Sequence, residues 1–95
     1  MKCLGLIGLG MIGGSIASGL KRALPQTRIA ALDVSEDALR YGLNEGLIDD
    51  IAPTIDNLMR MSDVICLCVP IKQLPTLMPA LRAFSGVVTD VGSVK

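Results

Sequence analysis

The sequence of 95 residues contains no histidine and no tryptophan, and it has a single phenylalanine and a single tyrosine. Nine basic side chains balance nine acidic ones, so the formal net charge is zero. Without a basic excess to neutralise phosphates, and with so few rings to stack on bases, the composition argues against a nucleic-acid-binding protein. Since 51% of the residues are hydrophobic and only 19% are charged, it also excludes intrinsic disorder.

The three cysteines fit neither a disulfide framework nor a zinc site. Cys66 and Cys68 lie two positions apart in an apolar run, where we expect their side chains to point to opposite faces of a strand. The chain has no CxxC pair and no histidine that could complete a tetrahedral metal site. We therefore predict that no metal is bound and that the cysteines are small core residues of a cytoplasmic protein.

The length of the chain allows one domain at most. So high a hydrophobic content in so short a chain indicates that some apolar surface faces another domain or subunit. We expect the chain to be a fragment of a larger protein.

Residues 3–20 carry no charge, and this length is typical of a transmembrane helix or a signal peptide. Six of these residues are glycine, however, and each glycine costs about 1 kcal/mol relative to alanine in a helix. The spacing instead predicts a strand over residues 2–7, a glycine turn, and an amphipathic helix whose apolar face is Ile12, Ile16, Leu20, Ala23 and Leu24. This arrangement argues against a secreted or membrane protein.

The glycine turn has the pattern GxGxxG. In a dinucleotide-binding unit the first glycine makes the tight turn, the second lets the backbone approach the pyrophosphate, and the third lets helix and strand pack closely. The pyrophosphate lies on the N–H groups that begin the helix, where the helix dipole favours an anion. We predict that the turn binds the cofactor through Gly8, Leu9, Gly10, Met11, Ile12 and Gly13.

Asp33 follows Gly13 by twenty residues, at the end of a second predicted strand over residues 28–32. At this position a carboxylate accepts a hydrogen bond from the adenosine ribose 2′-hydroxyl. The alternative is a helix cap, because residues 33–36 have the spacing of a capping box and Ser35 could itself cap the next helix. If Asp33 binds the ribose, a 2′-phosphate would meet an anion with no obvious arginine beside it, so NAD is favoured over NADP.

The rest of the chain alternates between helical and strand patterns. Residues 35–44 predict a helix with Ala38, Leu39 and Leu43 inward and Gly46 as its end. Residues 47–55 are a short strand or an irregular link, residues 56–61 a short helix, and residues 64–69 and 87–90 two further strands. Over residues 74–81 the apolar spacing is helical, although Pro75 and Pro79 argue against an uninterrupted helix.

This alternation predicts an α/β fold, a Rossmann-type doubly wound parallel sheet of about five strands with helices on both faces. In such a sheet the ligand binds beyond the carboxyl ends of the strands, where the sequence places Gly8, Asp33, Pro70 and Asp90.

The chain ends in the motif TDVGSVK, residues 89–95. From the residues alone, Asp90 and Ser93 are either polar groups beside the nicotinamide or caps of a following helix. Together with residues 8–20 (GLGMIGGSIASGL), Asp33 and residues 62–70, this motif resembles the nucleotide-binding domain of the prephenate and arogenate dehydrogenases of tyrosine biosynthesis. The resemblance covers essentially the whole chain, and TDVGSVK is its most specific part.

The resemblance implies an NAD-dependent oxidative decarboxylation. A hydride passes from the hydroxyl-bearing ring carbon of prephenate to the nicotinamide, CO2 is lost, and the ring becomes aromatic to give 4-hydroxyphenylpyruvate; arogenate would give tyrosine. Asp33 matches the NAD-preferring pattern of the family. The resemblance also implies that Val69, Pro70 and Asp90 contact the cofactor, and that Ser93 supports a catalytic histidine and the substrate hydroxyl.

That histidine, the arginines for the substrate carboxylates and the helical domain of the family's homodimer would all lie beyond Lys95. We therefore expect residues 1–95 to be the N-terminal NAD(P)-binding domain of a dehydrogenase, truncated before its helical C-terminal domain and inactive alone. We expect no domain before the first strand, and a regulatory domain could follow the catalytic region.

Two further functions are compatible with a nucleotide-binding chain. One is that of another Rossmann oxidoreductase, such as a relative of the β-hydroxyacid dehydrogenases or pyrroline-carboxylate reductases, which the terminal motif disfavours. The second is that of an NAD-binding module without chemistry, which the sequence does not distinguish from an inactive dehydrogenase fragment.

Overall fold

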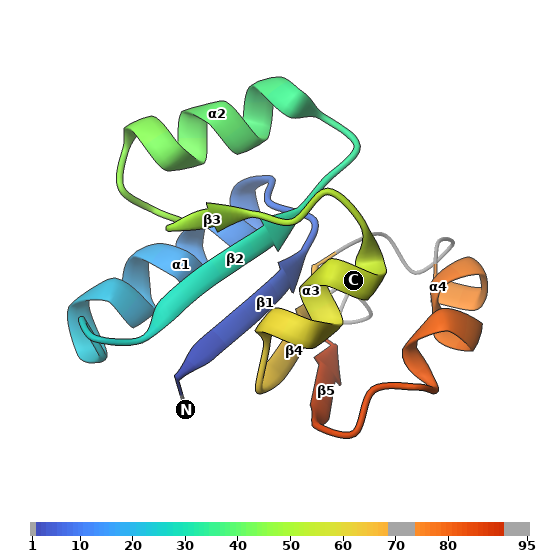
Figure 1. The fold of residues 1–95 in the computed structure, drawn as a ribbon. Coiled ribbons are helices and arrows are strands. Elements are labelled where there is room, and N and C mark those ends of the chain that lie inside the picture. The colour runs from blue at the N-terminus through green and yellow to red at the C-terminus, as the bar shows by residue number, and fades with distance from the viewer. Residues whose placement is uncertain (1, 69–73, 91–95) are drawn as a thin grey trace.

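The computed structural model describes residues 2–68 and 74–90. In chain order the elements are β1 (Cys3–Ile7), α1 (Met11–Ala23), β2 (Arg28–Leu32), α2 (Glu36–Asn44), β3 (Asp50–Ile51), α3 (Ile55–Met61), β4 (Val64–Leu67), α4 (Leu74–Leu81) and β5 (Val87–Asp90). The five strands pair in parallel in the order β3-β2-β1-β4-β5 (Figure 1). The predicted Rossmann-type parallel sheet is confirmed.

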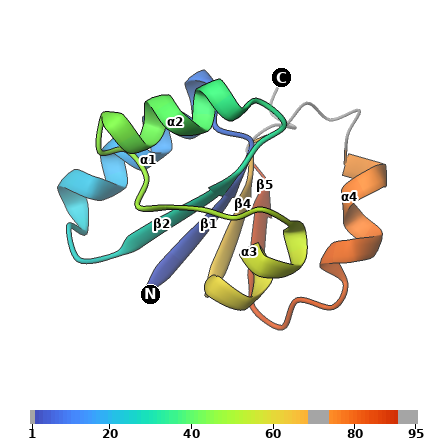
Figure 2. The ribbon, with the colours of Figure 1, turned by 45° about the horizontal axis from the view of Figure 1, so that its top comes forward.

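Helices cover both faces of the sheet, as Figure 2 shows. On one face, Ala17 of α1 and Leu39 of α2 pack against Leu4 and Leu6 of β1. On the other face, Leu58 of α3 and Leu81 of α4 pack against the alternate strand positions. The buried strand side chains there include Cys3, Ile7 and Ile65. The sequence order changes direction between β1 and β4, which lie side by side at the centre of the sheet. In a doubly wound sheet, the ligand binds beyond the carboxyl ends of the strands at the point where the order changes direction.

The uncharged residues 3–20 form β1, the glycine turn and the first part of α1, which is a helix of 13 residues. Within residues 2–68 and 74–90, no helix is long and apolar enough to span a membrane. The predicted apolar face of α1 is wrong at its end, because Ala23 and Leu24 are exposed. The helix ends at Ala23, and the Leu24 N–H donates to the carbonyl oxygen of Leu20 at 2.6 Å. Ala17, which the apolar pattern left out, is fully buried, because a small side chain lets the helix lie close to the sheet.

The expectation that Cys66 and Cys68 point to opposite faces is wrong. Side chains two positions apart in a strand share a face, and the two sulfur atoms lie 3.7 Å apart on the α1 side of the sheet. Cys3 packs on the opposite side. None of the three cysteines forms a disulfide, and Cys3 and Cys66 are buried as predicted, whereas Cys68 is half-buried.

Two helices differ in detail from the prediction. α4 contains both Pro75 and Pro79, so the expected interruption is absent. Pro75 lies in the first turn, where a backbone N–H has no acceptor within the helix, and only Pro79 removes a helical hydrogen bond. In α2, Leu43 is exposed, because the neighbouring Gly42 is buried against Leu9 and Ile48 instead. Gly46 ends this region as predicted, with a φ of +74°.

Candidate functional site

The turn between β1 and α1 depends on glycine at two positions. Gly8 has a φ of +92°, a conformation that favours glycine, and its N–H donates to the carbonyl oxygen of Leu32 at 2.8 Å. At Gly13, a Cβ atom would lie only 2.5 Å from the carbonyl oxygen of Gly8. The first and third glycines of the motif are therefore required by the backbone itself, in the positions predicted for the tight turn and the close packing.

The second glycine faces open space. A Cβ atom at Gly10 would meet no heavy atom within 4 Å, and the residue is exposed at the N-cap of α1. Within the described part of the chain, no side chain caps this helix, and its first turn contains no acidic residue. The N–H groups of that turn, which include those of Met11 and Ile12, have no acceptor within the helix. The start of α1 therefore presents uncapped donors and the positive end of the helix dipole, which suits an anion such as a pyrophosphate.

Asp33 joins this turn to the end of β2. Its Oδ2 accepts a hydrogen bond from the Leu9 N–H at 2.8 Å, and its Oδ1 accepts one from the Ser35 N–H at 3.0 Å. The cap of α2 is Ser35, whose Oγ accepts from the Ala38 N–H at 3.2 Å. Each carboxylate oxygen of Asp33 can accept a further hydrogen bond. The carboxylate is thus held by two backbone donors while it keeps acceptor capacity for a ribose hydroxyl.

A cavity of about 370 Å³ opens beside Asp33, at the carboxyl ends of β2 and β3. Its walls are Leu32, Asp33, Glu36, Leu39, Arg40, Ile51, Ala52 and Pro53. The expectation that no arginine lies beside Asp33 is therefore wrong for this cavity, because Arg40 lines it from α2. The sequence shows only that Glu36 and Arg40 are one helical turn apart on the helix that follows Asp33, not that both side chains line a cavity.

A second, larger groove of about 980 Å³ runs from Gly10 along the outer surface of α1 and α2. Its walls are mostly small side chains of α1, together with Arg22 and with Asp37 and Tyr41 of α2. It includes no residue from the strands themselves, whereas ligands of parallel α/β sheets bind at strand ends. We therefore place the candidate site at the glycine turn and the smaller cavity.

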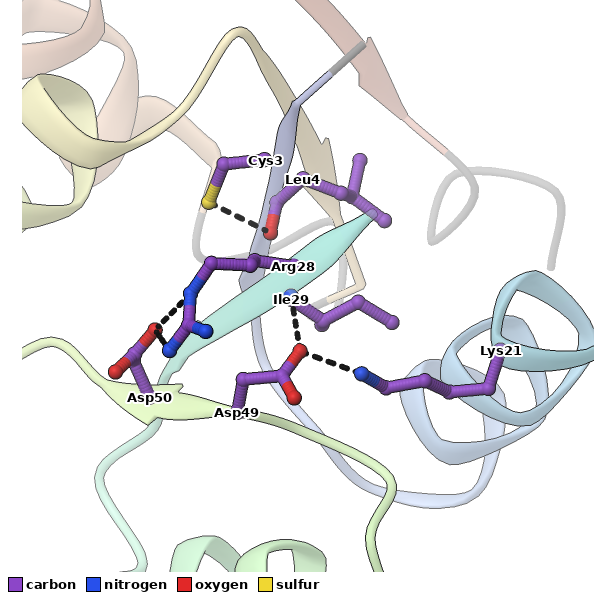
Figure 3. Close-up of polar contacts among 7 residues, drawn as sticks. All are labelled: Cys3, Leu4, Lys21, Arg28, Ile29, Asp49 and Asp50. Carbon is purple, nitrogen blue, oxygen red and sulfur yellow. Dashed lines mark hydrogen bonds and ion pairs between the residues drawn. The ribbon is translucent and has the colours of Figure 1, made fainter. Parts of the chain in front are cut away.

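Two ion pairs fix the edge of the sheet that carries this cavity (Figure 3). Lys21 Nζ lies 2.5 Å from Asp49 Oδ2, which also accepts from the Ile29 N–H at 2.8 Å. Burial alone would raise the pKa of the Asp49 carboxyl, but the hydrogen bonds from Lys21 and Ile29 outweigh it and hold this pKa below its ordinary value. Asp49 thereby ties α1 and β2 to the start of the two-residue strand β3.

The second ion pair joins β2 directly to the edge strand β3. Arg28 donates to Asp50 Oδ2 from Nη2 at 2.7 Å and from Nε at 3.1 Å, and these hydrogen bonds raise the pKa of the guanidinium above its ordinary value (Figure 3). β3 is thus held against β2, and the residues that follow it, Ile51 to Pro53, reach the cavity beside Asp33.

Of the remaining predicted site residues, Asp90 is the one within the described part of the chain. Asp90 is the last residue of β5, and its backbone is in register with Leu67 of β4, which is itself in register with Ile7. The backbone of Asp90 is therefore at the same edge of the sheet as Gly8 and Asp33. Val69, Pro70 and Ser93 fall outside the residues that the structure describes.

The doubly wound sheet and the glycine turn define a nucleotide-binding domain of the Rossmann type. Residues 16–95 match the family described as prephenate dehydrogenase, nucleotide-binding domain, and the chain belongs to this family. The family match begins after the glycine turn, so it is independent of the GxGxxG motif. The resemblance predicted from the sequence is confirmed.

Relatives of this chain include dehydrogenases of both expected kinds. A prephenate dehydrogenase from Bacillus subtilis (strain 168) is 36% identical over 95 residues, which cover 95% of this chain and 25% of that protein. The crystal structure of Synechocystis arogenate dehydrogenase is 29% identical with a TM-score of 0.80, over 94% of this chain and 32% of that one. Prephenate dehydrogenase from A. aeolicus, solved with hydroxyphenyl propionate and NAD+, has the same fold at a TM-score of 0.86 and 23% identity, over 95% of this chain and 33% of that one. The chain thus spans a quarter to a third of the length of these relatives.

Proposed function

We propose that this chain is the NAD-binding domain of a cytoplasmic prephenate dehydrogenase of tyrosine biosynthesis, and that residues 1–95 are its N-terminal part. The observation that carries the NAD-binding part of this proposal is the hydrogen bond between the Leu9 N–H and Asp33 Oδ2, at 2.8 Å. It couples the phosphate-binding turn to the carboxylate expected to bind the ribose. Because Asp33 is fixed by the turn, the two halves of the adenosine diphosphate site are preorganised together.

The described residues fit the adenosine diphosphate part of NAD. The pyrophosphate would lie over Gly10 on the uncapped N–H groups of α1, since the missing side chain leaves that space open. Asp33 would accept a hydrogen bond from the ribose, and the cavity between Arg40 and Pro53 would take the adenine. Val69, Pro70 and Asp90 would complete the nicotinamide side. When bound, NAD supplies the acceptor for a hydride.

The proposed reaction of the whole protein is the oxidative decarboxylation of prephenate to 4-hydroxyphenylpyruvate. Ser93 would orient the substrate hydroxyl and the catalytic base, which is not in this chain because the sequence contains no histidine. We therefore propose that the chain binds NAD without turning over substrate. From the family resemblance, we also propose that the whole protein is a homodimer. Arogenate is the second candidate substrate, which the Synechocystis relative supports. The same cofactor site would also suit a different Rossmann oxidoreductase or a non-catalytic NAD-binding module.

Calorimetric titration of the 95-residue chain with NAD and with NADP tests the cofactor site. Gly10→Ala should weaken NAD binding by at least about tenfold, or about 1.4 kcal/mol, because its methyl group fills the space over the start of α1. Gly19→Ala is the matched control, since it lies on the same helix and its Cβ atom also meets nothing within 4 Å. Equal NAD affinity in the two variants would contradict the proposed pyrophosphate position.

A further inference from the structure

The cavity beside Asp33 is lined by three charged side chains. Glu36 and Arg40 reach it from one face of α2, and Arg40 Nη2 lies 3.8 Å from Glu36 Oε1. Both side chains are mostly exposed, so this pair contributes little to stability. Of the described residues that line the cavity, Arg40 is the only cation and the other charged groups are two carboxylates. The cavity therefore carries a net negative charge, although it contains an arginine.

We propose that Glu36 and Arg40 are specificity-determining residues, in which Glu36 pairs with the one guanidinium that could otherwise bind a 2′-phosphate. This inference rests on the proposed NAD site and deepens it. Asp33 is then not alone in excluding NADP. Glu36 adds a second carboxylate to the same cavity and at the same time places a negative charge 3.8 Å from the Arg40 guanidinium.

The chemistry of the two cofactors explains why the pair matters. A ribose 2′-hydroxyl can donate a hydrogen bond to a carboxylate, whereas a phosphate carries about −1.5 to −2 charges and only accepts near neutral pH. Arginine binds phosphate through two parallel N–H groups, so an unengaged guanidinium at this cavity would attract NADP. Among the described residues that line the cavity, those other than Asp33, Glu36 and Arg40 are uncharged.

The fixed geometry of Asp33 makes the contribution of the pair separable. Asp33 is held by the N–H groups of Leu9 and Ser35, and no described hydrogen bond joins it to Glu36 or Arg40. Substitutions in the pair should therefore leave the ribose carboxylate in place. Their larger effect should be on the affinity for NADP, which alone carries the 2′-phosphate.

The test is a double-mutant cycle of Glu36→Gln and Arg40→Gln, with dissociation constants for NAD and NADP measured on the 95-residue chain at one ionic strength. Glu36→Gln should raise the affinity for NADP relative to NAD by about tenfold, because it removes an anion and leaves Arg40 without its pair. Adding Arg40→Gln should abolish most of that gain. NAD affinity should change less than NADP affinity in each variant, because NAD brings no second phosphate to the pair.

Asp37→Asn is the matched control. Asp37 also lies in the first turn of α2 and is exposed, but it lines the groove along α1 and not the cavity beside Asp33. The substitution Asp37→Asn therefore removes the same charge from the same end of α2 as Glu36→Gln does, without changing a residue that lines the cavity. The cycle is repeated in the Asp33→Ser background, where we expect NADP to bind more tightly and its affinity to be easier to measure.

If NAD binds and Glu36→Gln changes the NADP-to-NAD ratio no more than Asp37→Asn does, the inference is overturned and the proposed NAD site stands. A gain in Glu36→Gln that survives Arg40→Gln would also overturn it, since simple charge removal would then suffice. If the unaltered chain and every variant fail to bind NAD, the proposed function itself is wrong.

Discussion

Replacing Gly13 with alanine should destabilise the fold by about 1–3 kcal/mol, the usual cost of forcing a methyl group into a packed site. The added Cβ atom would lie 2.5 Å from the carbonyl oxygen and 3.3 Å from the carbonyl carbon of Gly8. Both are backbone atoms of the turn, so the clash is relieved only if α1 moves away from β1. That movement would also loosen Ala17, which is fully buried in the same interface.

The assay is urea unfolding followed by circular dichroism, with Gly19→Ala as the control. Gly19 has open space around its Cβ position, so alanine there should stabilise the helix by about 1 kcal/mol. The two alanine variants should therefore differ by about 2–4 kcal/mol in free energy of unfolding, even though each adds one methyl group to the same helix. If their unfolding midpoints coincide, the close approach of α1 to the turn is not as described.

Asp33→Ser should relax the discrimination against NADP by roughly 1–3 kcal/mol, which parallel titrations with NAD and NADP would detect; an unchanged preference would assign Asp33 to the turn alone. Asp49→Asn should lower the free energy of unfolding at pH 7 by about 1–2 kcal/mol, because the hydrogen bonds from Lys21 and Ile29 favour the ionised carboxyl. Since the folded-state pKa of Asp49 lies below its ordinary value of 3.8, this stabilisation should be present above pH 3.8 and be lost as the pH falls through the folded pKa. Unfolding curves at pH 7 and at a pH well below 3.8 would measure both effects, and an equal cost of Asp49→Asn at the two pH values would contradict the assignment. Burial raises the pKa of the Cys3 thiol, so mass spectrometry after alkylation at pH 8 should find the half-buried Cys68 labelled first; faster labelling of Cys3 would contradict its placement in the core.

The order of the elements follows from the sequence because its signals are local. Strand-length apolar runs, the glycine turn and the cap at Ser35 each depend on a few neighbouring residues, and all are found where expected. The short strand β3 is ambiguous in the sequence because it has only two residues, Asp50 and Ile51, and depends on pairing with β2. The partner residues in β2, and Arg28, whose side chain pairs with Asp50, are distant from β3 in the sequence.

The predictions from the sequence that proved wrong concern residues whose burial or exposure depends on three-dimensional packing. Burial of Ala17 and exposure of Leu24 depend on how closely α1 approaches the sheet and on where it ends. The helix through Pro79 forms although the apolar pattern and the proline conflict, since its last residue, Leu81, is anchored in the core. Arg40 escapes prediction as a site residue because a local pattern shows only its pairing with Glu36, not the cavity that both side chains line.

The most direct test of the proposed cofactor site is a two-dimensional NMR titration that follows the backbone amides of the 95-residue chain as NAD is added. We expect saturable shifts of the amides in the turn from Leu9 to Gly13 and of Ser35, whose N–H is bonded to Asp33. Shifts confined to Ser18, Arg22 and Tyr41, in the groove along the outer surface of α1 and α2, would show that NAD binds elsewhere. The absence of any shift at millimolar NAD would contradict the proposed cofactor site altogether.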